Sequence, residues 1–384
     1  MQLTKEEEKA LAGEKGEALA IAYRILLAIG ESTDAENLVP ITWAHVSGVN
    51  YNTIGDSGVK FLEGLSREGR FAVKTTINPM GFDPLKVRAL KLKEEFIQQQ
   101  NKIVSAYERM GSMKPYTCIP YEVFDLPPKD TSVSFAESNA AVYANSIAGL
   151  RTNKESALSA LASALTGKAP YSELRMEEMR KPNKCIKIKH VIENELDYGL
   201  LGYFAGKVAS DVVAFDGINT LEKRNAKALS AAIGTSGSCG MFTVGRTDCE
   251  TVEFGKEEMM KVRDELNTSD KGDLITLGSP QLGVDDLSLL SKMIEGKKFR
   301  KRCLIFCARA AYESATRLGY TQKIEQAGGE LLCDCCTCLT PLVDREEVDS
   351  VITNSIKGAY YLNSHNKVGV CLKPLKEIVK EECE

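Results

Sequence analysis

Short apolar runs alternate with helical periodicity in the last third of the chain. Runs at 274–277, 303–306 and 331–335 each have the length of a buried strand, and helical patterns at 284–295 and 309–326 lie between them. Strands that alternate with helices at this spacing predict a parallel, doubly wound sheet. Ligands of such sheets bind outside the carboxyl ends of the strands, so the residues that follow the three runs should line one rim.

The pattern in the first two thirds predicts further α/β units. A strand over 38–46, a helix from about residue 56 and a strand over 71–77 form a strand–helix–strand unit. The other expected elements are an opening helix over 5–29, later helices over 84–109, 137–150, 152–167 and 195–208, and a strand over 185–192. Sequence rich in proline and charge at 170–184 indicates a crossing between domains.

The composition fits a globular α/β protein with more than one core. Of the 384 residues, 43% are hydrophobic and 27% are charged, which is enough for two or three packed domains. We divide the chain into an α/β region with an N-terminal helix at 1–115, a central α/β region at 116–270 and a doubly wound region at 271–384. The last region carries a cysteine-rich segment at the end of its third predicted strand.

The charge pattern excludes some classes of partner. The formal net charge is −4, and the lysines and arginines are scattered, whereas a nucleic-acid or anionic-membrane partner would favour a basic face. The charged N-terminus lacks the apolar core of a signal peptide, and no apolar run approaches the roughly 20 residues that span a bilayer. We therefore expect a cytoplasmic protein, in which the 12 cysteines are thiols or metal ligands rather than disulfides.

Four of these cysteines lie together at 333–338, in two overlapping C-x-x-C pairs. If the segment is extended, Cys336 and Cys338 point to one side, and Cys333 and Cys335 to the other. A structural zinc site would want a second ligand pair, and the sequence contains no second C-x-x-C. An iron–sulfur cluster can instead take thiolates from distant loops.

A second cysteine in a turn makes such a cluster conceivable. Cys118, in a proline-containing turn, and Cys336 would then converge and leave one coordination position for a substrate. The competing interpretation is that these cysteines are simply buried, since a free cysteine packs as a small apolar residue. Cys303 is expected in the core, and Cys307 suits either role.

Polar residues near 150 suggest an anion site. Arg151 and Lys154, beside Asn145 and Asn153, would suit a carboxylate or phosphate, because guanidinium and amide donors fix such oxygens. A solvated hinge between helices is the alternative. Lys227 interrupts a helix of small residues, where a lysine that extends to solvent is the default interpretation.

The loop at 47–51, Ser-Gly-Val-Asn-Tyr, can cradle a ligand with its backbone N–H groups. No Walker or dinucleotide-binding glycine pattern occurs between a strand and a helix, and no G-x-S-x-G elbow is present. The sequence therefore gives no support to a nucleotide-binding enzyme or a serine hydrolase of that type.

Several stretches, in this order along nearly the whole chain, together resemble the large subunit of aconitase X, a branch of the aconitase superfamily of iron-dependent hydro-lyases. The matching segments are Ser-Gly-Val-Asn-Tyr at 47–51, Ile-Gly-Asp-Ser-Gly-Val at 54–59, Thr-Thr-Ile-Asn-Pro at 75–79, Thr-Cys-Ile-Pro-Tyr at 117–121, Ala-Glu-Ser-Asn at 136–139, Tyr-Ala-Asn-Ser at 143–146, Gly-Leu-Arg-Thr-Asn at 149–153, Lys-Ala-Leu at 227–229, Gly-Ser-Pro at 278–280, Asp-Cys-Cys at 334–336 and Thr-Asn-Ser-Ile-Lys at 353–357.

The resemblance implies an aconitase-like fold of three α/β domains, with mostly parallel, doubly wound sheets around a metal centre. Aconitase-type enzymes take their catalytic base, a serine, from a mobile swivel domain. The three core domains use up the 384 residues of this chain. We therefore expect a separate small subunit that carries the swivel domain and the serine, and a small anionic substrate.

The resemblance also implies roles for individual residues. Catalytic roles fall on Lys227, Asn145 and Lys357. The substrate-binding candidates are Ser47, Gly48, Asn78, Glu137, Ser138, Arg151, Asn153, Ser279, Asn354 and Ser355. The metal ligands are Cys118 and Cys336, with Cys307 or Cys338 as further candidates.

One departure from the family concerns the metal centre. Archaeal members tend to read Gly-Cys-Pro-His where this chain has Gly-Ser-Pro-Gln at 278–281, so one cluster cysteine is replaced by Ser279. Either Cys307, Cys335 or Cys338 takes its place, or the centre is smaller. The expected cofactor is thus an iron–sulfur cluster of the 4Fe-4S, 3Fe-4S or 2Fe-2S type, or a mononuclear iron.

Two activities of the family are candidates. One is dehydration of (R)-5-phosphomevalonate to trans-anhydromevalonate 5-phosphate, which the form of the 47–51 loop and the split subunit favour. The other is dehydration of cis-3-hydroxy-L-proline. The alternative from another class is a non-catalytic, metal- or redox-sensing relative, which the crowded cysteines and Ser279 favour.

Overall fold

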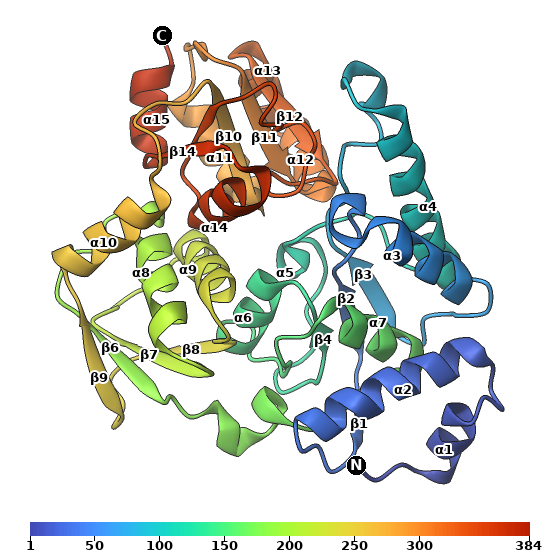
Figure 1. Ribbon diagram of the computed structural model, residues 1–384. Coiled ribbons are helices and arrows are strands. Elements are labelled where there is room, and N and C mark those ends of the chain that lie inside the picture. Colours follow the sequence, from blue (N-terminus) through green and yellow to red (C-terminus); the bar gives the residue numbers. More distant parts are fainter.

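The computed structural model describes residues 1–384 and contains three parallel sheets and one short antiparallel pair. In Figure 1 the first region, with the first sheet and α1 to α7 (blue to green), the middle region (yellow-green) and the C-terminal region (orange to red) meet near α5 and α6 at the centre of the molecule. None of the helices is both long enough and apolar enough to cross a lipid bilayer.

The first sheet has the strand order β3-β2-β4, and its strands are parallel. They are β2 (Trp43–Val46), β3 (Lys74–Ile77) and β4 (Ser134–Phe135), while β1 (Leu38–Pro40) pairs antiparallel with β5 (Lys168–Pro170). The helices of this region are α1 (Lys5–Leu11), α2 (Glu17–Ser32), α3 (Tyr51–Leu65), the 3-10 turn η1 (Val87–Ala89), α4 (Glu94–Met110), α5 (Pro120–Val123), α6 (Ser138–Ser146) and α7 (Ala157–Thr166).

Several helix boundaries in this region differ from the sequence predictions; α3 begins at Tyr51 rather than near 56, and α6 ends at Ser146 rather than near 150. The opening helix breaks into α1 and α2, because Gly13 and Gly16 adopt φ values of 90° and 96° that a helix cannot contain. The helix expected from 84 begins at Glu94. Helix α7 is capped by Ser156 rather than by Thr152 or Asn153.

The second sheet has the order β8-β7-β6-β9 and is parallel throughout. Its strands are β6 (Lys184–Ile188), β7 (Val212–Asp216), β8 (Met241–Val244) and β9 (Glu250–Phe254); its helices are α8 (Glu195–Val208), α9 (Lys223–Ser236) and α10 (Lys256–Leu266), and the 3-10 turns η2 (Glu173–Arg175) and η3 (Glu177–Arg180) precede it. Helix α8 has the predicted bounds. Helix α9 touches α6 at Gly234, where a Cβ would lie 2.8 Å from the backbone of Ser138.

The third sheet has the order β12-β11-β10-β13-β14, and every pairing is parallel, as the alternating pattern predicts. Its strands are β10 (Leu274–Leu282), β11 (Cys303–Cys307), β12 (Gly329–Cys333), β13 (Ser350–Thr353) and β14 (Gly369–Leu372); its helices are α11 (Val284–Met293), α12 (Arg309–Arg317), α13 (Tyr320–Gln326), α14 (Ile356–Tyr361), the π-helical turn η4 (Leu362–Asn366) and α15 (Leu375–Glu382).

Alternate residues of β11 and β12 join two different cores. Cys303 and Ile305 pack in the core that contains residues of α11, α12 and α13. Leu304 and Phe306 pack in a core shared with α8 and α9 of the middle region. Because this second core continues between the two regions, it fixes the third sheet relative to the helices around α6.

Candidate functional site

A pocket of about 420 Å³ lies where the carboxyl ends of the first and third sheets face each other. Its volume is in the range of small-molecule sites. Residues just beyond β2, β3, β4, β12 and β13 form much of its wall. The polar, sulfur-containing and aromatic side chains that line it are Ser47, Asn50, Thr53, Asn78, Cys118, Glu137, Ser138, Ser279, Cys336, Cys338, Lys357 and Tyr361.

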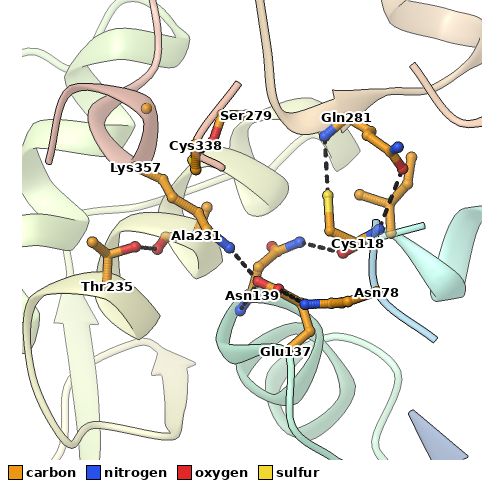
Figure 2. A network of polar contacts seen from close by, with 12 residues as sticks. Asn78, Cys118, Glu137, Asn139, Ala231, Thr235, Ser279, Gln281, Cys338 and Lys357 are labelled. Atoms are coloured by element: carbon orange, nitrogen blue, oxygen red, sulfur yellow. Dashed lines mark hydrogen bonds and ion pairs between the residues drawn. The ribbon is translucent and has the colours of Figure 1, made fainter. Parts of the chain in front are cut away.

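A buried ion pair crosses the pocket between the two regions. The Lys357 ammonium donates to Oε1 of Glu137, and Asn78 Nδ2 donates to Oε2 of Glu137 over 2.7 Å (Figure 2). Burial opposes the ammonium charge, but Glu137 outweighs it and raises the pKa of Lys357. Burial likewise raises the pKa of Glu137, and the neighbouring Lys357 more than offsets it, so the net pKa is lowered. Both groups therefore remain charged.

Three thiols lie on the wall of the same pocket. Cys118 Sγ accepts a hydrogen bond from Gln281 N over 3.2 Å, and burial raises the pKa of the Cys118 thiol. Cys338 Sγ lies 2.9 Å from Ser279 Oγ. A hydrogen bond from Cys336 lowers the pKa of Cys338, and the charge of Lys357 and the Ser279 hydroxyl act in the same direction. Cys338 is thus the thiol of the pair that favours the thiolate form.

The chemistry of these donors is the kind that an iron–sulfur cluster would use. Thiolates are soft ligands, and a cluster collects them from separate loops, as Cys118 and the pair Cys336 and Cys338 are arranged here. The Ser279 hydroxyl beside Cys338 supplies a further oxygen donor. No group of three or more His, Cys, Asp or Glu side chains is gathered around one point that could hold a single metal ion.

The cysteine-rich segment is not extended, and this corrects the alternation argument. Strand β12 ends at Cys333, and Asp334 adopts a left-handed φ of 59°, held by Arg309 Nε at 2.6 Å and by Tyr116 N. Cys333 and Cys335 consequently enter the two different cores rather than one shared face. The turn still brings Cys336 and Cys338 to the pocket together, as the sequence led us to expect.

The structure brings many of the predicted site residues together. Those that line the pocket are Ser47, Gly48, Asn78, Cys118, Glu137, Ser138, Ser279, Cys336, Cys338 and Lys357. Ser355 lies next to them, because its hydroxyl donates to the carbonyl of Ser279 and accepts from Gly358 N over 2.8 Å.

Lys227 lies behind the pocket. It is 3% exposed and forms ion pairs with Asp286 and, at 3.3 Å, with Glu122, so the expectation of a lysine extending to solvent is wrong. Its Nζ lies 3.5 Å from the carbonyl oxygen of Gln281. The backbone N–H of the same Gln281 donates to the Cys118 thiol. Asn354 lines a separate small cavity beside Asp286.

The polar residues near 150 also lie outside the pocket wall. Asn145 donates to the carbonyls of Thr152 and Gly240, at 2.8 and 3.0 Å, which ties the first region to the middle one. Arg151 pairs with Asp130 at 2.8 Å and with Glu177 on the surface.

Two further candidates are also placed elsewhere. Asn153 donates to Ser172 Oγ over 3.4 Å. Cys307 lies beside Cys333, with their sulfurs 3.8 Å apart, in the core that also contains residues of α11, α12 and α13. Neither residue lines the pocket.

Two residues whose contacts the sequence did not reveal, Gln281 and Asn50, connect the walls of the pocket. Gln281 Oε1 accepts a hydrogen bond from the backbone N–H of Cys118 over 3.2 Å, and Gln281 Nε2 donates to the carbonyl oxygen of Cys335 over 3.0 Å. Asn50 caps α3 and donates to the carbonyl of Leu339 over 3.0 Å. The N-cap preference of asparagine before a helix was the available signal for Asn50, whereas nothing local to Gln281 indicates its partners.

Three helices begin at the pocket. The N-cap residues of α3 and α6, Asn50 and Glu137, and the first residue of α7, Ala157, all line it. Gly48, with φ of 75°, lets the first loop approach α7, since a Cβ there would lie 3.1 Å from that of Ala157. Helix N-termini carry partial positive charge, so this wall favours an anionic ligand.

Comparison with known proteins agrees with this architecture. Family models described as the first, second and third domains of aconitase X match residues 1–178, 182–273 and 272–384. The phosphomevalonate dehydratase large subunit of Methanocaldococcus jannaschii is 35% identical, with 99% of this chain and 100% of that protein covered. The cis-3-hydroxy-L-proline dehydratase of Hypocrea jecorina is 31% identical, with 94% of this chain but 65% of that protein covered.

A solved structure agrees as well. The crystal structure of Thermococcus kodakaraensis aconitase X in its holo-form superimposes with a TM-score of 0.92 at 33% identity and covers 100% of both chains. The aconitase-like α/β fold expected from the motifs is therefore confirmed. With three family models in order along its length and relatives above 30% identity over nearly all of it, this chain belongs to the aconitase X family.

Proposed function

We propose that this chain is the large subunit of an iron-dependent hydro-lyase that dehydrates (R)-5-phosphomevalonate to trans-anhydromevalonate 5-phosphate. The observation that carries the hydro-lyase assignment is the pocket in which the charged pair of Glu137 and Lys357 adjoins the thiols of Cys118, Cys336 and Cys338, and the choice of phosphomevalonate rests on the relatives. A charged pair suits proton and oxyanion chemistry, and the thiols suit iron.

The relatives support both the reaction and the division into subunits. Full-length archaeal relatives that carry the name phosphomevalonate dehydratase large subunit are 35% and 33% identical to this chain. The cis-3-hydroxy-L-proline dehydratases, by contrast, extend beyond the part that this chain covers, which is 65% of their length. The name large subunit, carried by the archaeal relatives, supports a partner small subunit for the present chain, to which we assign the serine that removes the proton.

The residues of this chain would then bind and orient the substrate. Cys118, Cys336 and Cys338 would hold the iron centre, which supplies Lewis-acid assistance to the departing hydroxyl when bound. Lys357 keeps its proton, because its pKa is raised, so it serves as a hydrogen-bond donor to a substrate oxygen and not as the base. Glu137 holds the ammonium in place.

The anionic groups of the substrate would face the helix N-termini. The starts of α3, α6 and α7 converge on the pocket, and their backbone N–H groups and partial charge favour phosphate or carboxylate oxygens. Ser47 and Ser138 lie on the same wall and supply hydroxyl donors.

The second candidate is cis-3-hydroxy-L-proline, and the Glu137–Lys357 pair favours it. An amino acid carries one cation and one anion, and this pocket presents one side chain of each opposite charge. The phosphate group of phosphomevalonate binds to cations and N–H donors and gains nothing from a carboxylate such as Glu137. The two substrates would therefore contact different residues of the pocket wall.

Anaerobic purification with the cognate small subunit, followed by iron and sulfide analysis and assays with both substrates, tests the proposal. We expect iron in the complex and turnover of phosphomevalonate, and no turnover by the large subunit alone. Turnover of hydroxyproline only would assign the second candidate. An iron-loaded complex that dehydrates neither hydroxy acid would refute the enzyme assignment.

A further inference from the structure

A continuous chain of buried hydrogen bonds runs from the first sheet to the ion pair of the pocket. Trp43 Nε1 lies 2.8 Å from Thr76 Oγ1, which lies 2.8 Å from His45 Nδ1. His45 Nε2 lies 2.9 Å from Asn78 Oδ1, and Asn78 Nδ2 lies 2.7 Å from Glu137. The first three of these side chains are at most 1% exposed, so water does not compete for the bonds.

Chemistry at the two ends fixes the direction of every bond. An indole N–H can only donate, so Thr76 Oγ1 accepts from Trp43 and its own proton is free for His45 Nδ1. An ionised carboxylate can only accept, so Asn78 presents its NH₂ group to Glu137 and its oxygen to His45. A neutral His45 therefore carries its proton on Nε2 and accepts from Thr76 at Nδ1.

The opposite tautomer is incompatible with the ion pair. With the proton on Nδ1, the Nε2 atom of His45 would accept, and Asn78 would have to turn its NH₂ group toward the histidine. Its oxygen would then face the carboxylate of Glu137, and two acceptors repel. Thr76, opposite His45 on the adjacent strand β3, prevents this by donating to Nδ1.

The surroundings keep His45 neutral. Burial lowers the pKa of His45 to about 4, while Glu137 and the Asn78 hydrogen bond oppose this and Lys357 acts with it. His45 lies in β2, between β3 and β4, where its partners in register are Thr76 and Phe135. Its aromatic contact is the ring of Phe135, at 5.8 Å.

We propose that His45 is a positioning residue of this site: by donating from Nε2 to Asn78 it fixes the amide that holds Glu137 against Lys357. The role in turnover rests on the proposed dehydratase function, whereas the tautomer does not. His45 does not itself line the pocket, so it acts through Asn78, which does.

Two substitutions distinguish the role of Nε2 of His45 from that of Nδ1. His45→Gln places an amide N–H near the position of Nε2 and keeps the donor to Asn78. His45→Asn is too short to reach Asn78 and keeps only a contact toward Thr76. In the two-subunit enzyme, we expect His45→Asn to lower kcat per bound iron by about 10- to 100-fold, with KM, iron content and melting temperature close to the wild type, and His45→Gln to restore most of kcat.

Nitrogen NMR of ¹⁵N-histidine-labelled large subunit reads the tautomer without any assay. The chain has only 3 histidines, and His190 and His365 are exposed and can be assigned by substitution. We expect a His45 signal with the proton on Nε2 that stays neutral from pH 5 to 8. A proton on Nδ1, a protonated ring, or equal kcat in His45→Asn and wild type would overturn the proposal. An inactive wild-type complex with the expected NMR signal would instead count against the proposed function alone.

Discussion

The thiol of Cys338 lies 2.9 Å from the hydroxyl of Ser279, on two segments that only the fold brings together. Ser279 stands where the family resemblance leads us to expect a cysteine. The fold thus places the Cys338 thiol next to the position at which the expected cysteine is replaced by Ser279. The pKa of this Cys338 thiol is lowered.

We expect Cys338→Ala to remove most of the bound iron, because it deletes the thiolate beside Ser279. Adding Ser279→Cys to this variant should restore iron, since the new thiol would lie within the same space. Iron and sulfide content of anaerobically purified protein measures both effects. Full iron content in Cys338→Ala would show that Cys338 is not a ligand.

Cys336→Ala and Cys333→Ala should behave differently. Cys336 lines the pocket, and its loss should abolish bound iron. Cys333 is 1% exposed in the core beside Cys307, so its replacement should retain iron and cost about 1 kcal/mol of stability through lost packing. Cys307→Ala is the matched control. Equal loss of iron in the Cys333 and Cys336 variants would contradict the placement of the cysteine loop.

Replacing one member of the Glu137–Lys357 pair should cost more stability than replacing both. Lys357→Met leaves Glu137 buried without its counter-charge, for which a loss of about 3–5 kcal/mol is typical. The double variant Glu137→Gln, Lys357→Met buries no charge and should unfold at a higher temperature than either single variant. Thermal melts of the four proteins test this; additive losses would mean that the pair is not coupled.

Glu195 should make the protein less stable as the pH rises. Burial, and then the charge of Asp286, raise the pKa of Glu195 to about 7 in the folded chain from its ordinary value of 4.5. The unfolded chain therefore loses this proton first, and the contribution of Glu195 to stability, complete below pH 4.5, disappears between pH 4.5 and 7. Glu195→Gln should flatten this part of the profile. Melting temperatures of both proteins from pH 5 to 8 give the difference, and parallel profiles would exclude the effect.

The sequence predicted the sheets better than the positions of single polar residues. Buried parallel strands read as apolar runs, so β10, β11 and β12 were visible in the pattern, and α8 was found with its bounds. The turn after Cys333 was not predicted, because the left-handed backbone conformation of Asp334 leaves no clear signal in the local sequence.

Partners distant in the sequence explain the other differences. The sequence pattern indicated that Lys227 extends to solvent, because it does not reveal that Glu122 of α5 and Asp286 of α11 form ion pairs with it. His45 lies within the strand Trp-Ala-His-Val, and nothing in this local sequence distinguishes a histidine in a hydrogen-bond network from one that only packs in the core. Its hydrogen bonds depend on the neighbouring strand β3, which only the register of the sheet supplies.

The middle region contributes no side chain to the pocket, yet its helix α9 packs closely against α6, which begins at the pocket wall. At Gly234 the backbone of α9 lies so close to Ser138 that a Cβ would come within 2.8 Å of it. Ser138 is the first residue of α6 and follows Glu137 directly. A larger residue at position 234 would push the start of α6 aside, and Glu137 with it, so this remote glycine couples the position of the middle region to the geometry of the ion pair in the pocket.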